Sequence, residues 1–244
     1  MASNILFGFH AVTVRLKTAP KSIVEIHVDA SRRDQRMRQF VERAKDAGAR
    51  LIDSDDTRLQ KLCGTHRHQG VVARAEAVAM SHSLDDTLDA VDGDPLLLVL
   101  DGITDPHNLG ACLRVADGAG VHAVVAPKDH AVGLNATVAK VSSGASDTVP
   151  YLMVTNLARS LNELKERNIR VIGLLDTARK SLYDIDLSGP LAFVLGAEGS
   201  GMRQLTAKTC DELVSLPMRG AVESLNVSVA AGICLYEVLR QRGG

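Results

Sequence analysis

The second half of the chain alternates short apolar segments with helical patterns, and this alternation limits the folds that it can adopt. The predicted strands are residues 96–100, 122–126, 170–175, 191–195 and 212–216. The predicted helices between and after them are residues 109–118, 134–141, 156–167, 202–209 and 227–240. Strands that alternate with helices form a mostly parallel sheet with helices on both faces. The second half is therefore predicted to be an α/β domain.

A glycine-rich turn follows the fourth of these strands. The segment FVLGAEGSGM contains Gly196, Gly199 and Gly201, and Glu198 is its single charged residue. Glycine permits positive φ angles and a close approach of a ligand to the backbone, and ligands bind at the carboxyl ends of such strands. The spacing differs from the dinucleotide fingerprint, and no Gly-Lys-Ser/Thr phosphate loop follows. The turn indicates either a ligand site of another kind or a tight loop that needs glycine for geometry alone; a helix is expected from Met202.

The composition is that of a globular protein, with 45% hydrophobic, 23% charged and 3% aromatic residues. No apolar run approaches the roughly 20 residues of a membrane helix, and the N-terminus lacks the pattern of a secretion signal. We therefore expect a cytoplasmic protein without membrane association. The sequence also predicts reduced, buried thiols and no metal site, because no ligand spacing joins the four cysteines or the two neighbouring histidines, Cys63, Cys112, Cys210, Cys234, His66 and His68.

Positive charge is concentrated in the first part of the chain. Residues 1–75 hold 14 Lys and Arg against 8 Asp and Glu, a net charge of 14 − 8 = +6. The remaining residues hold 14 and 21, a net charge of 14 − 21 = −7. This asymmetry indicates either that the first part binds a polyanion or that the surface charge is simply uneven.

Residues 1–75 are predicted to form a small α/β domain. Its helices are expected at residues 8–17, 33–47 and 55–62, and its strands at residues 23–28, 50–53 and 70–73. Four arginines lie near the start of the second helix: Arg32, Arg33, Arg36 and Arg38. They could bind RNA phosphates or form a solvated helix face. Residues 76–94 are acidic, with no Lys or Arg, and are predicted to be a linker containing a short helix that starts at Ser83.

Two further loops of the second half carry polar residues. Asn108 follows the first strand of this half at a position typical of a helix N-cap, and Arg114 lies in the helix after it. Both have a structural alternative, capping for Asn108 and solvent exposure for Arg114. Ser224 and Asn226 are candidates to cap the last helix. That helix is apolar or small nearly all round for three turns, which indicates burial on more than one side and hence a homodimer.

Three segments together resemble a known family. LVLDGITDPHNLGACLRVADGAGVHAVV, FVLGAEGSGM and LPMRGAVESLNVSVAAGICLYE are similar to the three ordered motifs of the SpoU-type, TrmH-like RNA ribose 2′-O-methyltransferases of the SPOUT superfamily. The resemblance covers about 150 residues. The first part, including His68-Gln69-Gly70, resembles the substrate-binding domain of the bacterial enzymes that methylate a guanosine of 23S rRNA, a domain similar to ribosomal protein L30e.

The resemblance implies an architecture and a cofactor. The architecture is an L30e-like RNA-binding domain at 1–75, the linker at 76–94, and a catalytic domain at 95–244 whose parallel sheet contains a deep trefoil knot. The knot implies a site for S-adenosylmethionine and a homodimer through the catalytic domain. The residues matching the cofactor site are Gly196, Gly201, Leu216, Pro217, Met218 and Leu225.

The resemblance also implies which residues act on the substrate. Arg114 matches the proposed activator of the ribose hydroxyl, and Asn108, Glu198, Ser224 and Asn226 match the other polar positions. Because a guanidinium stays protonated in proteins, Arg114 is expected to bind a phosphate and orient the hydroxyl. Glu198 is expected to hold Arg114 or a substrate hydroxyl.

The expected reaction is 2′-O-methylation of a guanosine in 23S rRNA, either free or in an assembling large subunit. Methylation of transfer RNA is the chief alternative, because the catalytic motifs are shared across the family. A non-catalytic ribosome-assembly factor and an ordinary nucleotide-using enzyme are the rival classes. The basic first half and the absence of a dinucleotide fingerprint disfavour the last of these.

Overall fold

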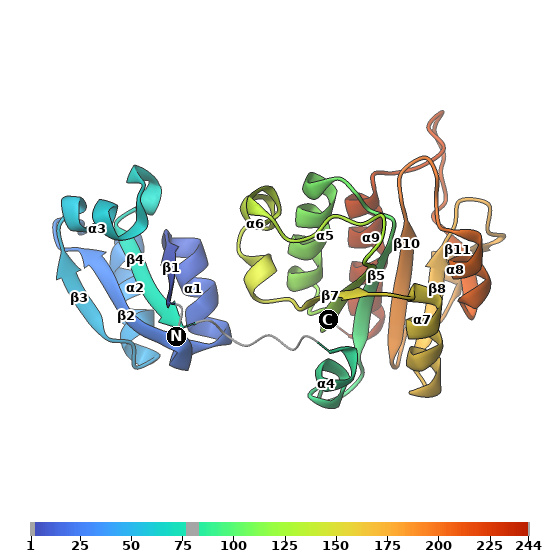
Figure 1. Ribbon diagram of the computed structural model, residues 1–244, viewed down its shortest axis with the longest axis horizontal. Coiled ribbons are helices and arrows are strands. Elements are labelled where there is room, and N and C mark those ends of the chain that lie inside the picture. The colour runs from blue at the N-terminus through green and yellow to red at the C-terminus, as the bar shows by residue number, and fades with distance from the viewer. Residues whose placement is uncertain (1–2, 77–82, 244) are drawn as a thin grey trace. The chain divides into compact units, whose positions relative to one another are not determined.

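The computed structural model describes residues 3–76 and 83–243, and the chain divides into two compact units, Met1–Met80 and Ser81–Gly244. Figure 1 shows the elements of each. The linker prediction falls partly on residues 77–82, which lie outside the described residues. Its second half forms α4 (Leu84–Asp89), with Ser83 as the N-cap, as predicted. Leu88 of α4 is buried in a core cluster of the second unit.

The first unit is built on a four-stranded sheet. Its strands are β1 (Ser3–Phe7), β2 (Ile23–Asp29), β3 (Leu51–Ser54) and β4 (Val71–Glu76), in the order β1-β4-β2-β3. Only β2 and β3 pair in parallel. Helices α1 (Phe9–Thr18) and α2 (Gln35–Asp46) pack on one face of the sheet, against side chains such as Ile26 and Ala73. Helix α3 (Asp56–Cys63) lies outside that cluster, with Leu59 fully buried. Strand β1 was not predicted, because its five residues are too few to show a clear alternation of apolar and polar side chains.

The second unit contains a seven-stranded sheet in which every pairing is parallel. The strand order is β7-β6-β5-β10-β8-β11-β9. The strands are β5 (Leu96–Asp101), β6 (Ala123–Pro127), β7 (Tyr151–Val154), β8 (Arg170–Leu174), β9 (Lys180–Ser181), β10 (Leu191–Gly196) and β11 (Glu212–Ser215). The predicted mostly parallel α/β sheet is confirmed. Strands β7 and β9 were not predicted, because both are short edge segments.

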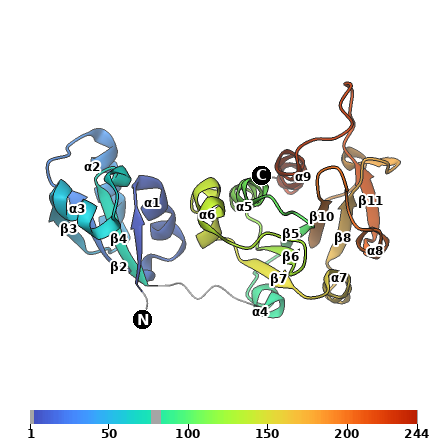
Figure 2. The ribbon, with the colours of Figure 1, turned by 45° about the horizontal axis from the view of Figure 1, so that its top comes forward.

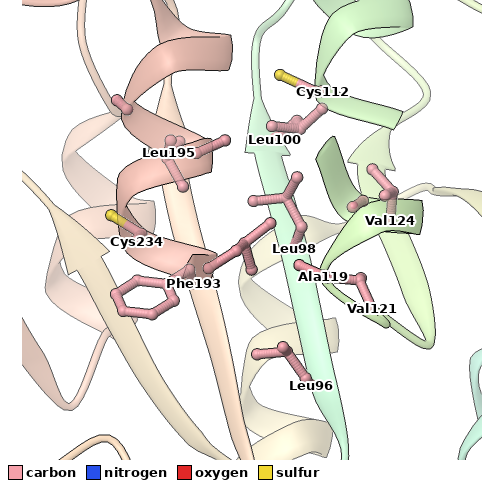
Figure 3. Packing of buried hydrophobic residues seen from close by; sticks show 14 of the residues in the cluster. Leu96, Leu98, Leu100, Cys112, Ala119, Val121, Val124, Phe193, Leu195 and Cys234 are labelled. Carbon is pink, nitrogen blue, oxygen red and sulfur yellow. The ribbon is translucent and has the colours of Figure 1, made fainter. Parts of the chain in front are cut away.

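Helices cover both faces of this sheet, as Figure 2 shows. On one face lie α5 (Pro106–Gly118), α6 (Ala136–Ser142) and α9 (Val227–Gln241); on the other lie α4, α7 (Leu157–Glu166) and α8 (Gln204–Thr209). Each face of the sheet has its own hydrophobic core, and successive residues of a strand point alternately into one core and the other. Leu98 and Phe193 belong to the first core (Figure 3), whereas Leu97 and Val194 belong to the second. Both faces are therefore apolar, and the strand sequences are continuous apolar runs.

Two expectations about local structure were wrong, and the alternative that Asn108 caps a helix is excluded. Asp105, not Asn108, caps α5, because its side chain accepts a hydrogen bond from the amide of His107 at 2.9 Å and Pro106 starts the helix. Helix α8 begins at Gln204 rather than at Met202, which is 8% exposed and packs in the core. Of the four cysteines, Cys112 and Cys234 are buried, but Cys63 and Cys210 are only partly so; all four are free thiols.

Short 3-10 turns complete the described elements, at Pro20–Ser22, His66–His68, Ala145–Asp147 and Leu182–Asp184.

Across residues 3–76 and 83–243, none of the helices combines the length and the apolar character that a membrane crossing requires.

Helix α5 approaches α6 closely at Gly110. A Cβ at this position would lie 2.7 Å from Val141 Cβ, whereas a Cβ at Gly232 in α9 would lie 3.7 Å from Val115 Cγ1. We expect Gly110→Ala to lower the free energy of unfolding by about 1–3 kcal/mol through overpacking. Gly232→Ala should raise it by up to about 1 kcal/mol, because alanine is the better helix former. Urea denaturation of both variants measures the difference; equal effects would contradict the close approach.

Candidate functional site

The glycine turn lies at the carboxyl end of the two central strands. Gly196 of β10 is aligned with Asp101 of β5. A two-way backbone contact closes the turn: the amide of Ala197 donates to Gly201 O at 3.1 Å, and the amide of Gly201 donates to Ala197 O at 2.8 Å. A Cβ on Gly196 would lie 2.1 Å from the amide nitrogen of Met202, and Gly201 has φ of 66°. Both positions therefore require glycine for the backbone alone.

Three segments far apart in the sequence meet at this turn through Asn108, Glu198 and Asn226. Glu198 Oε1 accepts hydrogen bonds from Asn108 Nδ2 at 3.2 Å, from Asn226 Nδ2 and from the amide of Val227 at 3.3 Å. Asn226 Nδ2 also donates to Asn108 Oδ1 at 2.9 Å. The three predicted polar residues thus form one network. Asn226 additionally caps α9, because its Oδ1 accepts from the amide of Ser228 at 3.0 Å.

A pocket of about 290 Å³ opens beside this network. Its apolar wall comes from Leu195, Leu216, Leu225, Val227 and Ala230. Three carboxylates, those of Asp176, Glu198 and Glu223, also line it. Of the residues expected at a cofactor site, the lining includes Gly196, Gly201, Leu216, Met218 and Leu225 but not Pro217, and it includes Ser224. Neither Asp176 nor Glu223 was singled out from the sequence, since an isolated acidic loop residue carries no recognisable pattern.

Arg114 does not line the pocket. Its side chain is exposed on α5, and it forms no hydrogen bond or ion pair with any residue within 3–76 and 83–243. The expected contact with Glu198 is therefore not formed; Glu198 is bound by amide groups instead. Gly118 follows Arg114 by one helical turn on the same face of α5, and a Cβ there would lie 3.1 Å from the hydroxyl of Tyr236 in α9. Arg114 thus lies along the seam between α5 and α9.

Asp101 is a residue of the site that sequence reasoning missed. It ends the buried strand β5 and is 1% exposed. Its Oδ2 accepts from the amide of Arg203 at 2.9 Å, and its Oδ1 accepts from Arg203 Nε and Nη2, both at 2.6 Å. Because Arg203 lies two residues after Gly201, this pair holds the end of the glycine turn against the end of β5. An aspartate that closes an otherwise apolar strand was the available signal.

Burial raises the pKa of the Cys112 thiol on α5 to about 12, and the negative charge of Glu198 adds to the effect. The thiol is therefore protonated at neutral pH and is unreactive as a nucleophile. Among the described residues, no group of three or more His, Cys, Asp and Glu side chains could hold a metal ion.

The four arginines singled out in the first unit differ in their surroundings. The guanidinium of Arg32 pairs with Asp34 and donates to Gln69 O at 2.7 Å. Arg33, Arg36 and Arg38 are exposed, and within the described part of the chain they form no ion pair.

The chain matches known proteins along both units. Residues 95–236 match the family model of the SpoU rRNA methylases, and residues 5–80 match that of RNA 2′-O ribose methyltransferase substrate binding. A protein of Ralstonia nicotianae, 23S rRNA (guanosine-2′-O-)-methyltransferase RlmB, is 62% identical over 98% of this chain and 96% of its own length.

Solved structures share the fold. The crystal structure of an RNA 2′-O ribose methyltransferase gives a TM-score of 0.70 at 27% identity, covering 98% of this chain and 89% of that one. The SpoU methyltransferase AviRb from Streptomyces viridochromogenes, in complex with AdoMet, gives 0.68 at 24% identity, covering 98% and 90%.

The substitution Asp101→Asn tests whether the ion pair between Asp101 and Arg203 stabilises the glycine turn. Removing one partner of a buried ion pair costs about 3–5 kcal/mol, and we expect about 2 kcal/mol here because the Arg203 side chain is 49% exposed. The control is Asp92→Asn, an exposed carboxylate for which a change within about 0.5 kcal/mol is expected. Chemical denaturation measures both, and equal stabilities would show that the pair does not hold the turn.

Proposed function

The chain belongs to the SpoU rRNA methylase family, and we propose on this basis that it methylates the 2′-hydroxyl of a guanosine ribose in 23S rRNA with S-adenosylmethionine. The observation that carries the proposal is the 62% identity to the Ralstonia nicotianae 23S rRNA methyltransferase over nearly the whole of both chains. We place the reaction in the cytoplasm, where rRNA is modified, with free 23S rRNA or the assembling large subunit as the substrate.

The pocket at the glycine turn suits the proposed cofactor. Its volume of about 290 Å³ is at the lower end of ordinary ligand pockets. The wall of Leu195, Leu216 and Leu225 offers an apolar surface for an adenine ring. Asp176, Glu198 and Glu223 give the rim negative charge, which favours a ligand that carries a sulfonium and an ammonium group. When bound there, S-adenosylmethionine supplies an electrophilic methyl group.

The network beside the pocket supports a positioning role. Asn108 and Asn226 each present an amide group held by Glu198, so their orientations are fixed before a substrate arrives. A ribose hydroxyl that must attack in line gains most from such fixed geometry. We propose that Asn108 and Asn226 orient the ribose or its phosphate, that Glu198 holds both amides, and that Ser224 orders the loop over the cofactor.

Arg114 is proposed to bind the phosphate beside the target ribose. The ribose hydroxyl is a poor acid, so a positive charge that stabilises the developing oxyanion lowers the barrier. The guanidinium remains protonated and does not itself accept the proton. Its freedom from protein partners in the described residues leaves its fork available to RNA.

The architecture proposed with this function has three parts. Residues 1–75 form an L30e-like RNA-binding domain, 76–94 a linker, and 95–244 a catalytic domain whose C-terminal segments form a trefoil knot. The central place of β10, between β5 and β8, supports the knot, because the chain then continues to β11 and returns to pack α9 beside α5. The match of residues 5–80 to a substrate-binding family supports the RNA-binding role.

Methyl transfer from labelled S-adenosylmethionine to unmodified 23S rRNA, with unmodified tRNA in parallel, tests the function. We expect 2′-O-methylguanosine in the digested rRNA and none in the tRNA. Transfer to tRNA alone would contradict the assigned substrate, and cofactor binding without transfer to rRNA or to a pre-ribosomal particle would favour a non-catalytic assembly factor.

Arg114→Ala is expected to reduce kcat by about 10²–10³-fold, the usual cost of removing one donor to a developing oxyanion. The Kd for S-adenosylmethionine should be unchanged, because Arg114 does not line the pocket. Arg114→Lys should also be impaired if the guanidinium fork binds two phosphate oxygens. Arg159→Ala, on α7 at the opposite face of the sheet, is the matched control. A near-normal kcat for Arg114→Lys would contradict the role of the fork.

A homodimer is proposed through the face formed by α5 and α9. Val229 and Tyr236 of α9 are 50% and 54% exposed, and Ile233 lies between them on the same stripe. We expect Val229→Asp to give a monomer, because the charge would be buried in the interface. Leu205→Asp on α8, at a position 64% exposed on the other face, should leave the dimer intact. Light scattering after size exclusion measures both masses; a dimeric Val229→Asp would exclude this interface.

A further inference from the structure

A second candidate site, lined by basic side chains, lies in the first unit, in a hollow of about 210 Å³ between α1 and α2. Its lining residues are Phe9, Thr13, Arg36, Gln39, Phe40 and Arg43. Of these residues, only Arg36 was singled out from the sequence, and not Gln39 or Arg43. Arg36 and Arg43 are two helical turns apart and therefore share one face of α2. Arg38 follows Arg36 by two residues and points to a different face.

The hollow offers hydrogen-bond donors without any acidic group. Arg36 and Arg43 are exposed, and no carboxylate lines the hollow or pairs with either guanidinium in the described part of the chain. The Gln39 amide and the Thr13 hydroxyl add neutral donors at the same place. Arginine forks with neighbouring amides and hydroxyls are the set that proteins use to bind phosphate oxygens.

Aromatic packing holds Arg36 in place. Its guanidinium carbon lies 4.5 Å from the centroid of the Phe9 ring, and that of Arg32 lies 5.0 Å from the same centroid. The Phe9 ring in turn packs edge-on against Phe40 at 5.5 Å. Arg32 is fixed by Asp34 and by Gln69 O. The guanidinium of Arg32 is therefore already paired, whereas that of Arg36 is held over the ring and forms no ion pair with the described residues.

The burial of Phe9 and Phe40 limits the part of an RNA that can bind in the hollow. Phe9 is 4% exposed and Phe40 is 3% exposed, so neither ring is free to stack on a base. The donors of Arg36, Gln39 and Arg43 remain accessible, and these suit the backbone. We propose that this hollow binds phosphates of the RNA substrate and positions it without reading its sequence, an inference that rests on the proposed rRNA methyltransferase function.

Two variants of the full chain test the site. Arg36→Ala/Arg43→Ala removes both guanidiniums, and Gln39→Glu introduces a carboxylate of nearly the same size. Their controls are Arg58→Ala/Lys61→Ala on α3, which removes the same charge from another helix of the unit, and Gln35→Glu at the exposed start of α2. Binding to unmodified 23S rRNA is measured over a range of KCl concentrations, together with methyl transfer and thermal unfolding.

We expect Arg36→Ala/Arg43→Ala to weaken RNA binding at least tenfold at low salt. The slope of log K against log salt should fall by about 1 for each phosphate contact that is lost. KM for RNA should rise, while kcat at saturating RNA and the methylated nucleotide stay unchanged. Gln39→Glu should weaken binding in the same direction, with its melting temperature preserved. Both controls should bind RNA within about twofold of the wild type, the change expected from general charge alone.

The outcomes separate the site from the function. Methylation of 23S rRNA with equal RNA affinities for the Arg36/Arg43 and Arg58/Lys61 variants would overturn the site and keep the function. Loss of salt-dependent RNA binding in the first variant alone, without methylation by the wild type, would keep the site and overturn the function. A methylated position that shifts in Gln39→Glu would overturn the claim that the hollow reads no sequence.

Discussion

The parallel pairing of β10 with both β5 and β8 is the constraint on which the second unit depends. It places a late segment of the chain in the middle of the sheet, with Gly196 level with Asp101. Parallel strands end at the same edge, so the turn after β10 and the start of α5 after β5 are forced together. The network of Asn108, Glu198 and Asn226 is a consequence of that register. A shift of the register by one residue would turn the side chains of β10 to the opposite face of the sheet and would separate the three residues of the network.

The two carboxylates at this edge of the sheet, Asp101 and Glu198, have different hydrogen-bond partners. The difference indicates a structural role for Asp101 and a role in the site for Glu198. Asp101 is buried and receives a guanidinium and an amide from Arg203, so its charge is neutralised within the fold. Glu198 receives only uncharged N–H groups and keeps its negative charge beside the pocket. Together with Asp176 and Glu223 it gives a rim that attracts cations. Arg114, in contrast, is left without an acidic partner among the described residues and is available to an anion.

The sequence predicted the parallel sheet well because both of its faces are buried and its central strands are unbroken apolar runs. It failed at edge strands such as β7, which have little periodicity to read. The glycine turn and the polar network were reached through motifs, whereas Asp101 and Arg203 were not, since a pair 102 residues apart has no local pattern. The sequence left capping as an alternative for Asn108, because Asp105 and Pro106 begin α5 about one turn before the predicted start. Arg43 was not singled out, because its place in the hollow depends on which face of α2 packs beside α1.

Asn226 connects the folding of α9 with the assembly of the site. Its Oδ1 accepts from the amide and the hydroxyl of Ser228, at 3.0 Å and 2.6 Å, and so begins the helix. Its Nδ2 donates to Asn108 and Glu198 on the other side. An aspartate would cap the helix equally well, but it has no donor and would set a second negative charge against Glu198. Serine would cap but could not reach both partners. The choice of asparagine is therefore explained by the site and not by the helix, because its amide accepts for α9 through Oδ1 and has a separate N–H group that reaches both Asn108 and Glu198.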